Sequence, residues 1–127
     1  MTLVVDASAI AELLLGTERG AAVAEQLGDH GLTAPQHLTA EVASVIRGWA
    51  LDGHLSEAEA LQALREFQQL GVEQVPMIDL LPQVWALRHH VAAYDGMYIV
   101  LARATGYPLL TLDVRLARAA PDCALVP

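Results

Sequence analysis

The chain has no lysine and a single cysteine, and each of these absences excludes a mechanism. All seven basic residues are arginines, so no lysine can form a Schiff base, complete a P-loop or assist a phosphoacceptor aspartate. Cys123 has no second cysteine with which to form an internal disulfide. We therefore interpret Cys123 as a structural residue rather than as a nucleophile.

Long apolar runs, internal repeats and low-complexity stretches are also missing. No apolar run approaches the ~18 residues that a membrane-spanning helix requires, so we expect no membrane segment. The first residues lack a basic leader and include Asp6, so we expect no signal peptide and a cytoplasmic location. With 127 residues, 54% of them hydrophobic, the chain is expected to form one domain, residues 1–127, around a buried core.

Positive charge is scarce, because 15 Asp and Glu residues stand against 7 Arg and the net charge is −8. This balance argues against broad electrostatic binding of nucleic acid, which needs many cations facing the phosphates. It does not exclude an enzyme that acts on nucleic acid, because divalent cations reverse the local charge of the acids that bind them.

The order of apolar segments predicts an α/β fold in which short strands alternate with helices. The expected strands are Leu3–Val5, Leu32–Ala34, Val72–Pro76, Leu109–Leu112 and Ala124–Val126. The expected helices are residues 7–15, 18–27, 35–53, 56–70, 79–91, 95–105 and a short segment after Asp113. This alternation predicts a central parallel sheet of about five short strands flanked by helices on both faces, an α/β/α arrangement.

Several helices carry more specific expectations. Pro35 is expected to start the third helix, and Asp79 is expected to cap the helix that runs to Val91. Ser56 and Glu59 match a capping box at the start of the fourth helix. That helix carries an apolar stripe wide enough to serve both the core and a partner, formed by Leu61, Leu64, Phe67 and Leu70.

Four acidic residues are predicted to meet at one edge of the sheet. Asp6 and Asp113 each follow a strand and precede a helix, and the carboxyl ends of parallel strands share one edge. The helix from Asp95 rises ~15 Å and the return to Asp113 covers ~17 Å, so both residues should end at the same level. Glu41, expected two turns into the third helix, is long enough to reach the same crevice.

The three aspartates also have an alternative, purely structural role. Asp6, Asp95 and Asp113 are all placed to cap a helix. Several carboxylates at one edge repel one another unless a divalent cation joins them. Oxygen ligands without a set of His or Cys residues are typical of Mg²⁺ or Mn²⁺. Spacing alone therefore supports a metal site and a set of helix caps about equally.

Four short motifs surround these acids: Val-Val-Asp6-Ala-Ser8-Ala, Thr-Ala-Glu41-Val, Tyr-Asp95-Gly-Met-Tyr-Ile-Val-Leu-Ala and Leu-Leu-Thr111-Leu-Asp113-Val-Arg115-Leu. In this order, and at these separations, they resemble the motifs of PIN-domain ribonucleases, and more closely those of VapC-type toxins of bacterial toxin–antitoxin pairs. The resemblance spans the whole chain. One departure is Gly96, where a small alanine is more usual, and it affects helix stability rather than chemistry.

The resemblance implies a single PIN domain that acts as a Mg²⁺- or Mn²⁺-dependent endoribonuclease on structured RNA, such as transfer or ribosomal RNA. Asp6, Asp95 and Asp113 would bind the metal directly, and Glu41 would bind it directly or through water. The metal would polarise the scissile phosphate and lower the pKa of the attacking water. No side chain need act as the nucleophile.

The resemblance also suggests supporting residues and partners. Ser8 and Thr111 would donate hydrogen bonds to metal-bound water or to a phosphate oxygen, or serve as capping hydroxyls. Arg115 would contact RNA phosphate or the antitoxin, or lie on a solvated helix face. The family implies a homodimer and a cognate VapB-like antitoxin whose C-terminal segment docks near the acids, often with an arginine. An acidic surface suits such a partner.

Other conspicuous residues and functions are less well supported. His89 and His90 cannot face one ion from adjacent helix positions, and we interpret them as surface residues. Trp49 and Trp85 lie on apolar stripes, which favours packing in the core or an interface.

A haloacid-dehalogenase phosphatase would need an aspartate in place of Ser8, and a response-regulator receiver would need a lysine. A PIN nuclease outside a toxin–antitoxin pair and a non-catalytic PIN-like binding module remain alternatives.

Overall fold

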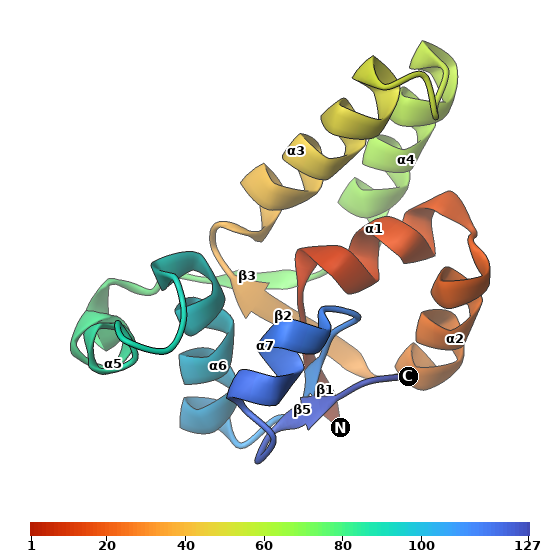
Figure 1. Ribbon diagram of the computed structural model, residues 1–127. Helices are drawn as coiled ribbons and strands as arrows, with labels where there is room; N and C mark the ends of the chain where they lie inside the picture. Colours follow the sequence, from red (N-terminus) through yellow and green to blue (C-terminus); the bar gives the residue numbers. More distant parts are fainter.

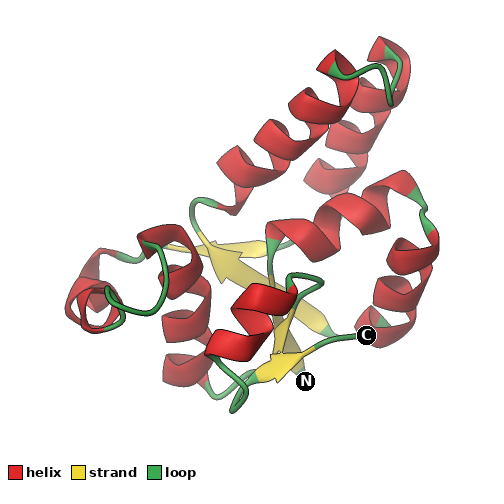
Figure 2. Cartoon of the chain, in the orientation of Figure 1, coloured by secondary structure: helices red, strands yellow, loops and turns green.

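Five short parallel strands form one sheet at the centre of the molecule, in the order β3-β2-β1-β4-β5 (Figure 2). The computed structural model describes residues 1–127. The strands are β1 (Thr2–Val5), β2 (Gly31–Pro35), β3 (Glu73–Val75), β4 (Leu109–Leu110) and β5 (Ala124–Leu125). All four strand pairings are parallel, which confirms the predicted sheet and places its last strand at an edge.

Helices cover both sides of this sheet, as the alternation of segments predicted. They are α1 (Ala7–Leu15), α2 (Glu18–Leu27), α3 (Leu38–Leu51), α4 (Glu57–Gln69), the 3-10 turn η1 (Ile78–Leu80), α5 (Leu81–Ala86), α6 (Ala93–Thr105) and α7 (Val114–Ala119). Figure 1 places α1 and α2 on one side of the strands and α5 and α6 on the other, while α3 and α4 project as a pair. No helix has the combined length and apolar character that crossing a membrane requires.

The central strand β1 and its neighbour β4 are the most deeply buried strands of the core. Leu3, Val4 and Val5 of β1 are at most 2% exposed, and Leu109 and Leu110 of β4 are fully buried. Residues of a parallel strand are covered on both faces, so they show a continuous apolar run rather than an alternation. The core therefore holds the ends of β1 and β4 in place. The residues that follow these strands, Asp6 and Thr111, are consequently held in fixed positions.

The expected start of the third helix is wrong. Pro35 is the last residue of β2, where it pairs with Val75, and α3 begins three residues later at Leu38. Proline lacks an amide hydrogen and is compatible with the end of a strand as well as with a helix start. Glu41 therefore lies in the first turn of α3 rather than two turns into it, close to the edge of the sheet.

The helix expected from Asp79 to Val91 is present only in its middle, and its predicted cap and bounds are wrong. Asp79 lies inside the 3-10 turn η1 and caps nothing, and α5 begins at Leu81 with Pro82 in its first turn. Proline fits only the first turn of a helix, and this fixes where the α-helical part begins. The helix ends at Ala86, so residues 87–90 form turns instead of a helical face.

The apolar stripe of α4 and the two tryptophans are buried to different degrees. Leu64 and Phe67 of α4 and its C-cap residue Leu70 pack against the core, and Leu61 alone of that stripe is exposed. Trp49 packs against the core as predicted. Trp85 does not, because it is 67% exposed on the short helix α5. The capping box of Ser56 and Glu59 is confirmed by both of its hydrogen bonds.

Candidate active site at the edge of the sheet

The strand register places Asp6 beside Thr111. Val5 pairs with Leu110, so the residues that follow them leave β1 and β4 side by side. Thr111 Oγ1 donates to Asp6 Oδ2 at 2.5 Å and accepts from the amide of Asp113 at 2.9 Å. One fully buried hydroxyl thus connects the carboxylate after β1 to the backbone after β4.

Asp6 is both a helix cap and the most enclosed of the four acids. Its Oδ1 accepts from the amide of Ala9, which caps α1, and from Ser8 Oγ at 2.8 Å. The side chain is 4% exposed, and this burial raises its pKa to about 6. Hydrogen bonds from Thr111, Ala9 and Ser8 oppose that rise, because they favour the charged carboxylate.

The hydroxyls of Ser8 and Thr111 both donate hydrogen bonds to the carboxylate of Asp6. Each hydroxyl has one proton, and both protons point at Asp6. Ser8 Oγ also accepts from the amide of Leu112 at 3.0 Å, so it joins the start of α1 to the segment after β4. Both hydroxyls therefore orient Asp6, and their predicted contact with metal-bound water or a phosphate oxygen stays a prediction.

Asp113 is the N-cap of α7, which confirms its predicted position between a strand and a helix. Its Oδ1 accepts from the amides of Arg115 and Leu116 at 2.9 and 3.2 Å. No hydrogen bond reaches Oδ2. The cap fixes the orientation of the carboxylate and leaves one oxygen free for another ligand.

Asp95 differs from the other two aspartates because it caps no helix. Helix α6 begins two residues earlier, at Ala93, so Asp95 lies in its first turn and its carboxylate makes no hydrogen bond or ion pair. Partial burial raises its pKa, and the neighbouring charges of Asp113 and Glu41 raise it further. Arg115 opposes these effects. The acids from α3, α6 and the end of β4 therefore lie within electrostatic reach of one another.

Glu41 is held by two side chains that were not predicted as site residues. Its Oε1 accepts from Tyr98 Oη at 2.6 Å and lies 3.2 Å from His37 Nε2. The same nitrogen is 3.1 Å from the carbonyl of Tyr94, so both neighbours are acceptors and Nε2 carries the proton. Burial raises the pKa of Tyr98, and its hydrogen bond to Glu41 adds to the rise. Glu41 Oε2 has no hydrogen-bond donor.

The sequence contains one indication that His37 contacts Glu41, and none that Tyr98 does. His37 precedes Glu41 by four residues, a spacing that brings side chains together on a helix. Tyr98 was predicted on the buried side of its helix, and it is 1% exposed. Its hydroxyl had no predicted partner, because Glu41 is 57 residues away in the chain.

Three of the four acids have oxygens that accept no hydrogen bond, whereas both oxygens of Asp6 are already engaged, and the four do not form a closed cluster. No group of three or more His, Cys, Asp or Glu side chains lies close enough together to hold an ion. The donor set nevertheless fits Mg²⁺ or Mn²⁺ chemically, because these ions prefer carboxylate and water oxygens. One oxygen each of Asp113 and Glu41, and both oxygens of Asp95, accept no hydrogen bond.

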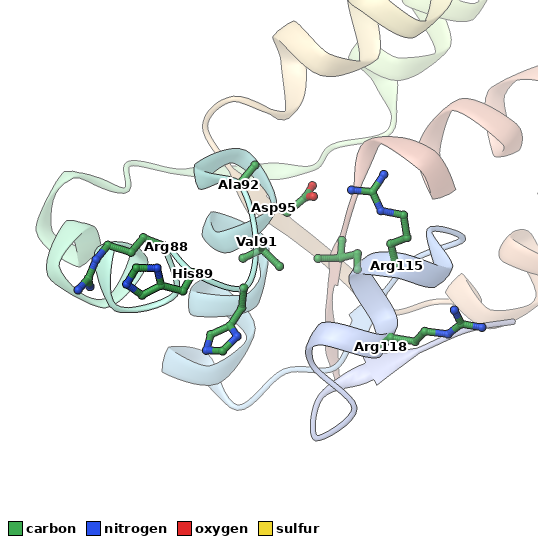
Figure 3. Close-up of a pocket in the computed structure, with 9 residues that line it drawn as sticks. Arg88, His89, Val91, Ala92, Asp95, Arg115 and Arg118 are labelled. Atoms are coloured by element: carbon green, nitrogen blue, oxygen red, sulfur yellow. The ribbon is translucent and has the colours of Figure 1, made fainter.

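A hollow of about 530 Å³ lies beside Asp95 and is lined largely by basic side chains (Figure 3). We call it the basic pocket, and its charged and polar members are Arg88, His89, His90, Asp95, Arg115 and Arg118. Figure 3 shows Asp95 between the turn that carries Arg88 and His89 and the helix α7 that carries Arg115. The predicted supporting residue Arg115 thus faces the acidic site across this hollow.

Comparisons with known proteins place this geometry in a family. The PIN domain family matches residues 3–121. Ribonuclease VapC12 of Mycobacterium tuberculosis is 38% identical over 116 residues, which cover 91% of this chain and 90% of that protein. Ribonuclease VapC3 of the same organism is 39% identical over 120 residues, covering 94% of this chain and 88% of the relative.

Solved structures share the fold. The crystal structure of PAE2754 from Pyrobaculum aerophilum superposes with a TM-score of 0.72 at 23% identity, covering 99% of this chain and 92% of that one. Mycobacterium tuberculosis VapC20, described as a sarcin-ricin loop cleaving toxin, gives a TM-score of 0.64 at 17% identity, with 92% and 94% covered. The family match covers all four acids and the two relatives are similar over nearly their full length. The chain therefore belongs to the PIN-domain family, among its VapC-type ribonucleases.

Proposed function

We propose that this protein is a divalent-metal-dependent endoribonuclease that acts in the cytoplasm as the toxin of a VapBC-type toxin–antitoxin pair. Its substrate is a structured RNA, such as transfer or ribosomal RNA. Family membership supports the reaction class, since the relatives are named ribonucleases. The four acids at the carboxyl edge of the sheet supply the site.

Asp6, Asp95 and Asp113 are the proposed metal ligands, and Glu41 binds the metal directly or through water. A bound Mg²⁺ or Mn²⁺ would polarise the scissile phosphate and lower the pKa of the attacking water. The protein's own residues prepare the ligands. Ser8, Thr111 and the amide of Ala9 orient Asp6.

The remaining acids are prepared in a different way. Tyr98 and His37 hold one oxygen of Glu41 and leave the other free. The amides at the start of α7 do the same for Asp113. No serine, cysteine or lysine is placed as a nucleophile, so water is the proposed attacking group.

The observation that carries the proposal is the mutual electrostatic effect of the acids. The negative charges of Asp113 and Glu41 raise the pKa of Asp95, and Asp113 raises that of Asp6. Separate helix caps have no need to lie within reach of each other's charge, whereas ligands of a shared cation do.

Cleavage of RNA by the purified protein tests the proposal directly. A mixture of transfer and ribosomal RNA is incubated with the protein across a Mg²⁺ and Mn²⁺ series and in EDTA. We expect cleavage that depends on the metal and is lost in Asp95→Asn. The matched control is Asp29→Asn, which removes one negative charge from an exposed turn far from the site. Cleavage in EDTA, or equal cleavage by Asp95→Asn, would contradict the metal mechanism.

We further propose that the protein forms a homodimer and is inhibited by an antitoxin segment that places an arginine among the four acids. Exposed apolar side chains near the site support such a contact, among them Leu81 and Trp85 on α5. A groove of about 430 Å³ between these residues, Val84 and Met97 suits an amphipathic segment. Light scattering measures the oligomeric state of the free protein.

Competition between the antitoxin and the metal tests the inhibitory contact. Both occupy the acids, so the antitoxin's affinity should fall as Mg²⁺ rises and should fall again when its arginine is replaced by alanine. An affinity that is indifferent to both changes would show that inhibition acts elsewhere on the surface.

A further inference from the structure

Positive charge is concentrated beside the acids although the protein as a whole is acidic. Three of its seven arginines, Arg88, Arg115 and Arg118, line the basic pocket. None of the three forms an ion pair with a carboxylate, and the arginine ion pairs of the structure lie elsewhere, at Arg19 and Arg103. The guanidinium of Arg88 donates to the carbonyl of Trp85 and lies over its ring, whereas those of Arg115 and Arg118 make no hydrogen bond. Guanidinium groups without a carboxylate partner remain available to an anionic ligand.

Two histidines line the same hollow because α5 ends early. His89 and His90 would diverge on a helix, but residues 87–90 form turns, and both histidines line the basic pocket. Both histidines are exposed, as the sequence interpretation predicted, although they lie in a turn and not on the expected helix. The turn brings both side chains to the hollow that Asp95 borders.

The hollow on the other side of the acids has a different character. It measures about 390 Å³, borders Glu41 and contains no arginine. Ala7, Ala40 and Val45 contribute apolar surface to it, and His37 is already engaged with Glu41. The two hollows that flank the acids therefore differ sharply in charge.

We propose that the basic pocket binds a backbone phosphate of the RNA adjacent to the scissile one, so that the RNA leaves the acids between the α5–α6 turn and α7 rather than along α3. This inference rests on the proposed ribonuclease function. Guanidinium groups bind phosphate through paired, charge-assisted hydrogen bonds. A protein of net charge −8 needs such local cations to hold a polyanion near its own carboxylates.

RNA fits this pocket better than an acidic peptide because of where the pocket lies. Asp95, a proposed metal ligand, is itself part of the lining. A phosphate in the pocket is therefore the neighbour of a phosphate at the metal, which matches the repeating charge of a nucleic acid backbone. The volume of about 530 Å³ also lies within the ~300–1,000 Å³ of typical ligand pockets.

Equilibrium binding of RNA, measured without turnover, tests the inference. A short fluorescein-labelled single-stranded RNA is titrated with full-length protein in EDTA, and anisotropy is recorded across a salt series starting at low ionic strength. The variants are Arg88→Ala and Arg118→Ala. The matched control is Arg47→Ala, an exposed arginine of α3 that forms no ion pair.

Each pocket variant should bind RNA about fivefold more weakly at ~0.1 M salt, and its salt slope should fall by ~0.7, as expected for one lost phosphate contact. Arg47→Ala should match the wild type. The inference is overturned if the pocket variants bind like the wild type, if Arg47→Ala loses as much, or if the wild type shows no binding at low salt. It is also overturned if the pocket variants keep RNA affinity and lose only antitoxin affinity.

The same samples separate this inference from the proposed function. If the wild type fails to cleave RNA with Mg²⁺ or Mn²⁺ while the pocket variants still lose affinity, the proposed function fails and the binding site stands. If Asp95→Asn abolishes cleavage while the pocket variants bind and cleave normally, the function stands and the RNA takes another path. Unchanged melting temperatures of both pocket variants verify that folding is intact.

Discussion

The two halves of the acidic site are built in different ways. The half that follows the strands, Asp6 and Asp113, is tied into the fold by hydrogen bonds from backbone amides and from Thr111. The half carried by helices, Glu41 and Asp95, depends on a few side-chain contacts or on none. Asp6 is buried, whereas Asp95 remains partly exposed.

The two halves therefore meet two different requirements of the site, a fixed position and an unoccupied carboxylate. The strand half fixes where the site lies, because β1 and β4 are buried and cannot shift without disturbing the core. The helix half keeps a carboxylate free of competing donors, which is what a metal ligand needs. Mutations should therefore affect stability mainly in the first half and chemistry in both.

The largest expected effect is on cleavage, and it should not distinguish the halves. Asp6→Asn and Asp95→Asn should each reduce RNA cleavage by more than ~100-fold, because even the hydrogen-bond partners of metal ligands contribute ~10–100-fold. Initial rates with Mg²⁺ are the measurement. Substantial activity in Asp95→Asn alone would show that only the strand half is catalytic.

The pH dependence of stability should distinguish the halves. The pKa of Asp6 is about 6 in the folded protein against 3.8 in the unfolded chain, so the folded state binds more protons between these values. The contribution of Asp6 to stability is therefore full below pH ~4 and is lost as the pH rises through ~6, by about 3 kcal/mol.

Urea unfolding in EDTA across this pH window measures the effect. Asp6→Asn should remove most of the slope and should be more stable than the wild type at pH 7 by about 1–3 kcal/mol. Asp95→Asn should change the slope less, because Asp95 is less buried. A steep slope that persists in Asp6→Asn would assign it to another group.

Removing the hydroxyl between the two strand ends should destabilise the protein. Thr111→Val keeps the shape of the side chain but leaves Asp6 Oδ2 without its donor and the Asp113 amide without its acceptor. We expect a loss of about 1–3 kcal/mol in the free energy of unfolding, since the group is fully buried. Thr39→Val, which alters an exposed hydrogen bond, is the control and should change stability little.

The smallest expected effect comes from the helix half. Tyr98→Phe removes the donor to Glu41 and should lower stability by about 0.5–1.5 kcal/mol. It should also weaken Mg²⁺ activation of cleavage by about 10-fold, because Glu41 loses a contact that orients it. Tyr107→Phe is the matched control, since the Tyr107 hydroxyl makes no hydrogen bond. An unchanged Mg²⁺ dependence in Tyr98→Phe would show that Glu41 needs no orientation.

Local sequence accounts for most of the secondary structure and for the candidate acids. Apolar periodicity predicted the strands and most helices, and the positions of Asp6 and Asp113 before helices predicted their capping roles, which the structure confirms. Both depend on residues within a few positions of one another. The errors arose at prolines: Pro35 ends a strand instead of starting a helix, and the α-helix near Pro82 is short.

The tertiary structure alone decided how the acids are held and what surrounds them. The hydrogen bond from Thr111 to Asp6 joins residues 105 positions apart in the chain. It forms because Val5 pairs with Leu110, and not with the residue before or after Leu110. The contact of Tyr98 with Glu41 likewise depends on how α6 packs beside β2. Sequence determined which residues carry charge and which segments form strands and helices, because those properties are local. Register and helix packing decided which charges meet, because a shift of one residue in a strand turns its side chains to the opposite face.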